Sequence, residues 1–214
     1  MTLAKLLPAG LTRRLRLDQR GVAFIEFAVT LPILLVLMSS GLELANYVIT
    51  LKRIGEIAAL TADNASRMGA QSAIRNKPIS EAEINDVFVG ANLQAGSIDL
   101  AQNGRIILSS LQRNGSDQQL IKWQRCFGDL THASSYGVEG DTPADGMGPA
   151  NDKVMAAPGT AVMVVEIAYE YKPLVPLISL PLGEITDYAA FNVRDDRDLS
   201  EVYNTDGDDV STCS

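Results

Sequence analysis

The residues best suited to chemistry lie near the N-terminus, where a glycine precedes an apolar run that contains one carboxylate. Gly21 has no side chain, so a protease can approach the backbone closely at the Gly21–Val22 bond. Glu26 is the only charged residue between Gly21 and Glu43, and an acidic group inside a bilayer costs roughly 2.5–3.5 kcal/mol. Cleavage after Gly21 would give Val22 a free amine one helical turn from Glu26. The two charges could then neutralise each other within a chain or between chains.

The chain has two cysteines, Cys126 and Cys213. In an exported domain an even pair most simply forms a disulfide, which here would close a loop of about 88 residues and stabilise the fold by about 4–5 kcal/mol. Two free thiols are the alternative. Because the cysteines form no CxxC motif and His132 is the single histidine, the sequence does not predict an ordinary zinc site.

Three further groups of polar residues could do chemistry, and each has a simpler interpretation. The carboxylates of Asp206–Asp209 could hold calcium, but they lack EF-hand spacing, so a solvated acidic tail is favoured. Glu166 and Glu170 share one face of a predicted strand, and solvent exposure explains them. His132 has neither a nucleophile elbow nor a phosphate-binding loop with it. We therefore expect no catalytic residues, no cofactor and no metal.

Charge is distributed unevenly along the 214 residues. Residues 1–21 hold five basic residues and one acidic residue, a charge of +4. The whole chain has a net charge of −8, so residues 22–214 carry −12. A strongly acidic domain disfavours nucleic-acid binding. A basic head before an apolar span places that head in the cytoplasm and the acidic remainder outside.

The apolar span runs from Val22 to Leu42 and contains one charge in 21 residues. As a helix it is about 31 Å long, enough to cross a bilayer. A signal peptide would be shorter and would be followed by a small-x-small cut site, so the alternatives are an unprocessed signal anchor and a span that starts after Glu26. Amphipathic spacing, including Ile54, Ile57 and Ala62, predicts that the helix continues toward residue 76.

The remaining elements predict an α+β fold with an antiparallel sheet. Ser80 and Glu83 form a capping-box pattern before a short helix. The pairs Asn103-Gly104 and Asn114-Gly115 predict hairpin turns within a meander. Predicted strands cover residues 97–100, 105–111, 119–126, 161–171 and 185–193, with a long surface loop over 127–160 and a polar tail from Arg194.

The N-terminal pattern resembles the processing site of type IV-class prepilins, in which a glycine precedes the cut and glutamate is the fifth mature residue. Counted from Val22, Glu26 is fifth and Phe27 is sixth. The Glu-Phe pair with Pro32 soon after is most similar to the TadE-like pseudopilins of the tight-adherence (Flp) pilus system. The resemblance is strongest over residues 20–45. Weaker motifs follow in the expected order: Trp123-Gln124-Arg125-Cys126, residues 164–171 and Val193-Arg194.

The resemblance implies a basic leader over 1–21, a transmembrane and spine helix over 22–76, and an extracytoplasmic α+β domain over 77–214. It implies that a prepilin peptidase cuts after Gly21, and that Glu26 promotes docking by meeting the N-terminal amine of a neighbouring subunit. The partners it implies are other pilin-like subunits, the pilus assembly machinery, the peptidase and membrane lipid, with no nucleic acid. It places the chain in the bacterial inner membrane with its domain in the periplasm, or in a pilus.

The function expected from this resemblance is that of a minor pseudopilin in pilus assembly, because a major pilin of that system would be far shorter. Two other classes stay open. An unprocessed, signal-anchored periplasmic binding module would keep residues 1–21, so processing separates it from a pseudopilin. An exported enzyme would need a catalytic constellation that the sequence does not show.

Overall fold

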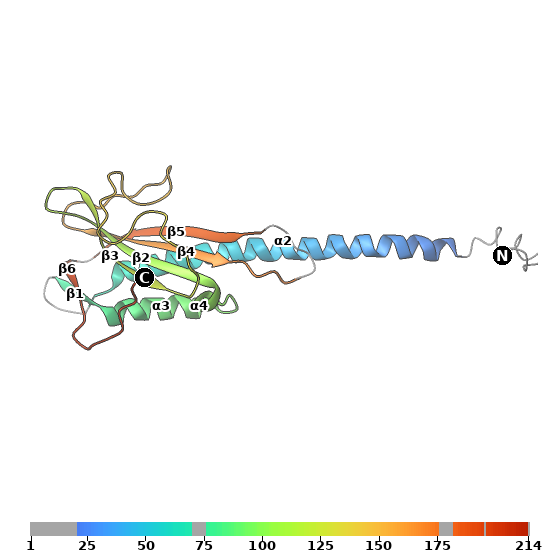
Figure 1. The fold of residues 1–214 in the computed structure, drawn as a ribbon, viewed down its shortest axis with the longest axis horizontal. Helices are drawn as coiled ribbons and strands as arrows, with labels where there is room; N and C mark the ends of the chain where they lie inside the picture. The colour runs from blue at the N-terminus through green and yellow to red at the C-terminus, as the bar shows by residue number, and fades with distance from the viewer. Residues whose placement is uncertain (1–20, 70–75, 176–181, 195, 214) are drawn as a thin grey trace, which may run out of the picture. The chain divides into compact units, whose positions relative to one another are not determined.

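The computed structural model describes residues 21–69, 76–175, 182–194 and 196–213 (Figure 1). Of the predicted leader, residues 1–21, all but Gly21 lie outside the described residues. The chain divides into two compact units, one of Met1–Asn46 with Leu174–Ser179 and one of Tyr47–Pro173 with Leu180–Ser214. Together they form an α+β fold, with a long N-terminal apolar helix and a four-stranded antiparallel sheet, as the sequence predicts.

Helix α2, Val22–Arg67, is continuous over 46 residues and contains Pro32. It ends nine residues before the predicted limit of 76, because Gly69 adopts a φ of +129° that a helix cannot continue. The carbonyls of its last turn are used by Arg197, which donates to Ala65 O at 3.1 Å and to Ser66 O at 3.0 Å. The C-terminal end of the helix therefore has its backbone acceptors satisfied inside the protein.

Helix α3, Glu81–Ala95, follows the short strand β1, Lys77–Ser80, and begins with the predicted capping box. Ser80 Oγ accepts from Glu83 N at 3.3 Å, and Glu83 Oε2 accepts from Ser80 N at 3.0 Å. The helix runs five residues beyond the predicted end at Gly90. Its apolar face continues that far, burying Ile84, Phe88, Ala91 and Ala95.

The predicted strand over 97–100 and the predicted hairpin turn at Asn103-Gly104 are wrong. Helix α4, Leu100–Asn103, occupies this position, with Asp99 accepting from Gln102 N at 3.4 Å as its N-cap. Gly104 then donates its N–H to Leu100 O and opens strand β2. Asp99 is a strong capping residue, and burial of Leu100 fixes the short helix against the core.

Four antiparallel strands form the sheet in the order β3-β2-β4-β5. Their ranges are β2 Gly104–Arg113, β3 Gln119–Phe127, β4 Ala161–Glu170 and β5 Glu184–Asn192. The β2–β3 hairpin turns at Asn114, as predicted, with Asn114 N donating to Gln118 O at 2.9 Å. Strand β4 pairs with β2 rather than with β3, so the meander is interrupted. Residues 128–160 must cross from the outer strand to the centre of the sheet; we call them the crossover segment.

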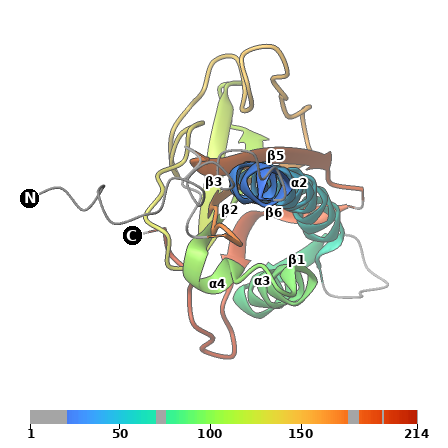
Figure 2. The same cartoon turned by 90° about the vertical axis from the view of Figure 1, so that its right-hand side faces the viewer.

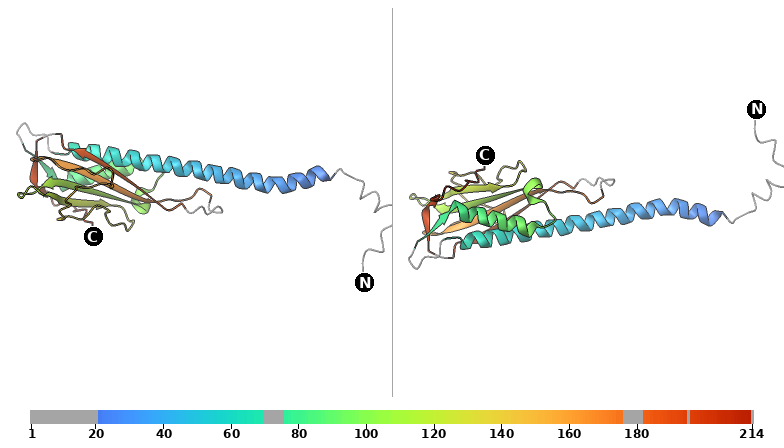
Figure 3. Two further views of the ribbon diagram at one scale, coloured as in Figure 1. Left: turned by 90° about the horizontal axis from the view of Figure 1, so that it is seen from above. Right: turned by 90° about the horizontal axis from the view of Figure 1, so that it is seen from below.

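Each face of the sheet is covered (Figure 2, Figure 3). Apolar residues of α3 and of the C-terminal part of α2 pack on one face, against side chains that include Ile106, Leu108, Met163, Val165 and Ile167. The crossover segment covers the other face and buries Met147 and Ala156 against Val162 and Val164. The predicted surface loop over residues 127–160 is largely exposed, as expected, but its few buried residues cover this face of the sheet, so β4 is buried on both sides.

The predicted polar tail is also partly wrong. Strand β6, Arg197–Tyr203, pairs in parallel with β1 in a separate two-stranded sheet. Arg197 is only 6% exposed, because it reaches the end of α2. By composition, a basic residue within a run of acidic residues indicates a solvated segment. The burial of Arg197 becomes evident only from its hydrogen bonds to the backbone carbonyls at the end of α2.

Candidate functional site

The predicted processing site lies at the first turn of α2. The helix begins at Val22, and Gly21 O accepts the first helical hydrogen bond, from Ile25 N at 3.1 Å. A Cβ added at Gly21 would meet no heavy atom within 4 Å in the described part of the chain. The fold of the described residues therefore gives no steric reason for glycine at this position.

Glu26 projects from the same turn and is exposed. Among the described residues its carboxylate has no hydrogen-bond or ion-pair partner; its backbone carbonyl accepts from Thr30 Oγ1 at 2.8 Å. Phe24 beside it is 76% exposed and Phe27 is 58% exposed. Val22, Glu26 and Phe27 thus lie on an open helical surface, free of the rest of the described chain.

The apolar half of α2 is largely uncovered by the described residues of the chain. Its most apolar 18-residue window is long enough to cross a membrane and is 0% buried. The large apolar side chains from Val22 to Leu42 are 47–76% exposed, except that of Leu31, which is partly buried; burial of one such side chain is worth roughly 1.5–3 kcal/mol. A helix in the core of a soluble protein would be buried, so the exposure of this half of α2 is consistent with membrane anchoring.

Glu43, immediately after the span, is a polar residue whose role sequence reasoning missed. A carboxylate that follows an apolar span indicates a solvated position by composition, yet Glu43 is 0% exposed. Its Oε1 accepts from Leu174 N at 3.3 Å and its Oε2 from Val175 N at 3.0 Å. No local pattern links Glu43 to residues 131 positions away, so the sequence alone carried no signal for this contact.

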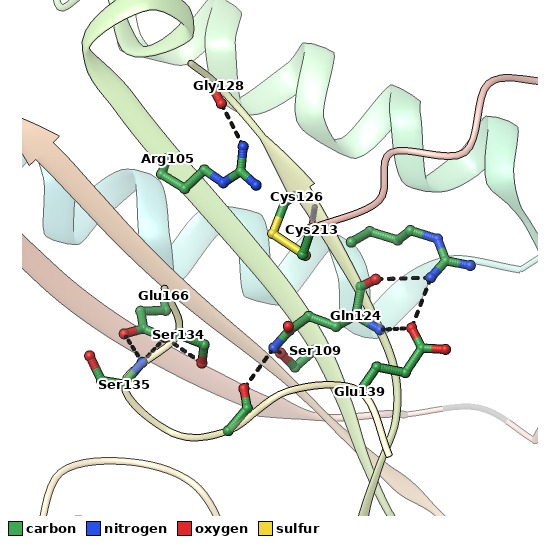
Figure 4. Close-up of a disulfide and its surroundings, with 12 residues drawn as sticks. Arg105, Ser109, Gln124, Cys126, Gly128, Ser134, Ser135, Glu139, Glu166 and Cys213 are labelled. Atoms are coloured by element: carbon green, nitrogen blue, oxygen red, sulfur yellow. Dashed lines mark hydrogen bonds and ion pairs between the residues drawn. A yellow bond between two sulfur atoms is a disulfide. The ribbon is translucent and has the colours of Figure 1, made fainter. Parts of the chain in front are cut away.

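Cys126 and Cys213 form the predicted disulfide, with Cα atoms 4.9 Å apart (Figure 4). The C-terminal tail is also held by backbone and side-chain hydrogen bonds. Cys126 N donates to Ser211 O at 2.8 Å, and Asn85 Nδ2 donates to Asp209 O at 2.9 Å. The disulfide therefore joins β3 to a tail that is already seated against β3 and α3.

Glu166 is not exposed to solvent as the sequence suggested. It is 4% exposed, and its carboxylate accepts from Ser134 Oγ at 2.9 Å and from Ser135 N at 2.9 Å (Figure 4). His132 lies close by, with Nε2 3.7 Å from Glu166 Oε1 and Nδ1 2.9 Å from Glu184 Oε1. The crossover segment covers this face of β4, which converts a nominally exposed carboxylate into a buried anchor.

This cluster does not have the geometry of a serine–histidine–acid triad. In such a triad the serine hydroxyl is hydrogen-bonded to the imidazole that deprotonates it. Here the hydroxyl of Ser134 is hydrogen-bonded to the carboxylate of Glu166. The arrangement holds residues 132–135 of the crossover segment to β4, and we assign it a structural role.

A second buried ion pair joins α3 to β3. Arg125 donates from Nε to Glu81 Oε2 at 3.0 Å and from Nη2 to Glu81 Oε1 at 2.6 Å. The side chains are 12% and 4% exposed. The hydrogen bonds to Glu81 raise the pKa of the Arg125 guanidinium above its ordinary value, and the two-bond contact fixes the start of α3 to the sheet.

A cavity of about 260 Å³ lies beside the disulfide. The crossover segment, β3 and the tail all contribute to its lining, including Ile107, Gln124, His132, Ser134, Thr212 and Cys213. Over the described residues 21–69, 76–175, 182–194 and 196–213, no three His, Cys, Asp or Glu side chains are grouped so as to hold a metal. The described tail carboxylates from Asp206 to Asp209 lie at the surface.

Comparisons of this chain with protein-family models, with curated proteins and with solved structures find no match.

Proposed function

We propose that this protein is a minor pseudopilin of a tight-adherence pilus, processed after Gly21 and assembled through the apolar half of α2. The observation that carries the proposal is an exposed membrane-length helix that begins one residue after Gly21 and has a partnerless carboxylate among its described neighbours, Glu26. The apolar side chains of such a surface need lipid around them, and the Glu26 carboxylate needs a positively charged partner.

Cleavage supplies that charge from the chain itself. Val22 and Glu26 are one turn apart in α2, so a new Val22 amine reaches the level of the Glu26 carboxylate on a neighbouring helix shifted by one turn. An opposite charge within about 4–6 Å favours the charged form of a carboxylate. In a low-dielectric layer this pairing offsets the cost of burying Glu26 and selects neighbours that are themselves processed.

The disulfide supports export of the domain. Disulfides persist in oxidising compartments such as the periplasm and are rare in the cytosol. The Cys126–Cys213 bond lies C-terminal to the span, and the segment N-terminal to the span, residues 1–21, carries a net charge of +4. Both features favour a cytoplasmic N-terminus and a periplasmic domain.

Processing tests the proposal. The full chain is made in cells with and without a prepilin peptidase, extracted from membranes, and examined by intact mass and N-terminal sequencing. We expect a mature chain that begins at Val22 only when the peptidase is present. Gly21→Leu should abolish this cleavage, whereas the matched change Gly41→Leu, inside α2 where an added Cβ meets nothing within 4 Å, should leave it intact.

A signal-anchored binding module is the second candidate, and the cavity of about 260 Å³ beside the disulfide is the observation that favours it. Such a protein would keep residues 1–21 under both conditions. An uncleaved chain in the presence of an active peptidase would therefore overturn the pseudopilin proposal and favour this candidate.

A further inference from the structure

Leu174 and Val175 belong to the same compact unit as the first half of α2, although β4 separates them from it in sequence. Their backbone N–H groups donate to the two oxygens of Glu43, at 3.3 Å and 3.0 Å. Glu43 is fully buried by this contact and its other neighbours. Hydrogen bonds to a charged acceptor are among the stronger ones in proteins, so the carboxylate holds these two residues at one level of the helix.

That level is the end of the apolar span. Leu42 is the last residue of the uncharged run that follows Glu26, and Glu43 is the next residue. When the span crosses a bilayer, Glu43 therefore lies at the boundary between acyl chains and headgroups, about 31 Å along the helix from Val22. Leu174 and Val175, which are bonded to Glu43, lie at the same boundary.

The two residues have the composition of a membrane contact. Leu174 is 65% exposed, and the sequence has no charged residue between Lys172 and Glu184. A polypeptide backbone outside helix or sheet is costly at this depth unless its polar groups are bonded. The N–H groups of Leu174 and Val175 meet that requirement, because they are bonded to Glu43.

We propose that Leu174 and Val175 form a second membrane contact, which rests on lipid at the acyl–headgroup boundary and is held there by Glu43. The partner is the bilayer surface rather than another protein, because the neighbouring part of α2 is itself exposed and apolar. Glu43 then has two effects: its own charge is shielded from lipid by backbone donors, and the apolar side chain of Leu174 is presented to the bilayer. This goes beyond the proposed function and does not depend on processing, since an unprocessed anchored chain would make the same contact.

Tryptophan quenching by brominated lipids tests the contact in the full chain. Leu174→Trp and, separately, Leu37→Trp are reconstituted at high lipid-to-protein ratio into vesicles whose lipids carry bromine either near the headgroup or deep in the acyl chains. Leu37 lies within the span and is 69% exposed, so its variant reports insertion. The native Trp123 is 5% exposed in the core, and unmodified chain gives its background.

We expect the Leu174→Trp variant to be quenched most by shallow bromine and the Leu37→Trp variant most by deep bromine. Adding Glu43→Leu should remove the shallow quenching of the first and leave the deep quenching of the second unchanged. Quenching of the Leu174→Trp variant no greater than background, with Leu37→Trp still quenched, would overturn the proposal. A blue-shifted emission without quenching would also overturn it, because the introduced side chain would then be buried against protein. Each outcome is independent of cleavage at Gly21.

Discussion

The apolar half of α2 and the domain that begins at Tyr47 differ in where their stability comes from. From Val22 to Leu42 the large apolar side chains, except that of Leu31, are 47–76% exposed. In the domain, two hydrophobic cores cover both faces of the sheet, and the Cys126–Cys213 disulfide joins the tail to β3. The apolar side chains of the first region are left exposed by the described chain, whereas those of the domain are buried by its own residues.

Two carboxylates on the same helix illustrate the difference. Glu43 is fully buried and is bonded to backbone N–H groups of this chain. Glu26 is exposed and has no partner among the described residues. A buried charge needs its partner in place, so Glu43 indicates a contact that already exists and Glu26 indicates one that assembly must supply. This difference is the basis for our proposal that the exposed apolar surface of α2, with its single charge at Glu26, is a surface for assembly.

The largest expected effect follows from removing the charge of Glu26. In Glu26→Gln the neighbouring amine would be buried without its partner, at a cost of roughly 3–5 kcal/mol, which weakens association by on the order of a hundredfold or more. Co-purification with pilin-like subunits from membranes of the native host measures it. The control is Glu56→Gln, at an exposed carboxylate on the same helix. Equal loss in both variants would remove Glu26 from its special role.

The disulfide should give the next largest effect, on the domain alone. Replacing Cys126 and Cys213 with alanine opens a loop of 87 residues and should lower the free energy of unfolding by about 4 kcal/mol. A domain of this size then melts roughly 8–16 °C lower. Thermal unfolding followed by Trp123 fluorescence in detergent measures the change. An unchanged midpoint would show that the seated tail holds without the bond.

Glu166 and Glu170 provide a smaller, matched test. Glu166→Leu leaves the donors of Ser134 and Ser135 without an acceptor and should cost about 1–3 kcal/mol. Glu170 lies on the same strand, with a side chain 59% exposed in a surface pair with Lys172, so Glu170→Leu should change stability by less than about 0.5 kcal/mol. Urea unfolding of both variants compares them. Similar costs would mean that the crossover segment is not anchored at Glu166.

The smallest effect concerns Tyr188 and alkaline pH. Burial raises the pKa of Tyr188 from 10.0 to about 12, and its hydroxyl is buried with no hydrogen-bond partner among the described residues. The folded state holds this proton more tightly than the unfolded state does. The contribution of the protonated Tyr188 to the free energy of unfolding is therefore complete below pH 10 and is lost as pH rises toward 12. In Tyr188→Phe the free energy of unfolding should fall less steeply with pH over that range, and at neutral pH it should be higher by up to about 1 kcal/mol. The measurement is the urea midpoint of the unmodified chain and of Tyr188→Phe across this pH range. Identical pH profiles for the two proteins would contradict the prediction.

Elements with strong local signals were predictable from the sequence. The α2 helix, the Ser80–Glu83 capping box, the Asn114 turn and the strand over 161–171 all depend on neighbours within a few residues, and each is present. The disulfide was predictable because only one pairing of two cysteines exists. Local periodicity and simple pairing were sufficient for the fold class.

The failures at Glu166 and Arg197 share one physical cause, which is a partner distant in sequence. Glu166 was expected in solvent because strand alternation does not reveal that a crossover segment covers that face. Arg197 was expected in a polar tail because its acceptors are the carbonyls at the end of α2. At Asn103-Gly104 two local signals competed, and the cap at Asp99 with burial of Leu100 prevailed over the turn.

The most direct test of the central claim is photo-crosslinking from the exposed surface of α2 in living cells. A photoreactive phenylalanine analogue is placed at Phe27, with Leu93 on α3, 75% exposed, as the control position, in cells with and without the peptidase. We expect crosslinks from position 27 to pilin-like subunits only when the peptidase is present, and none to them from position 93. Crosslinks from position 27 to lipid alone, unchanged by the peptidase, would contradict the account.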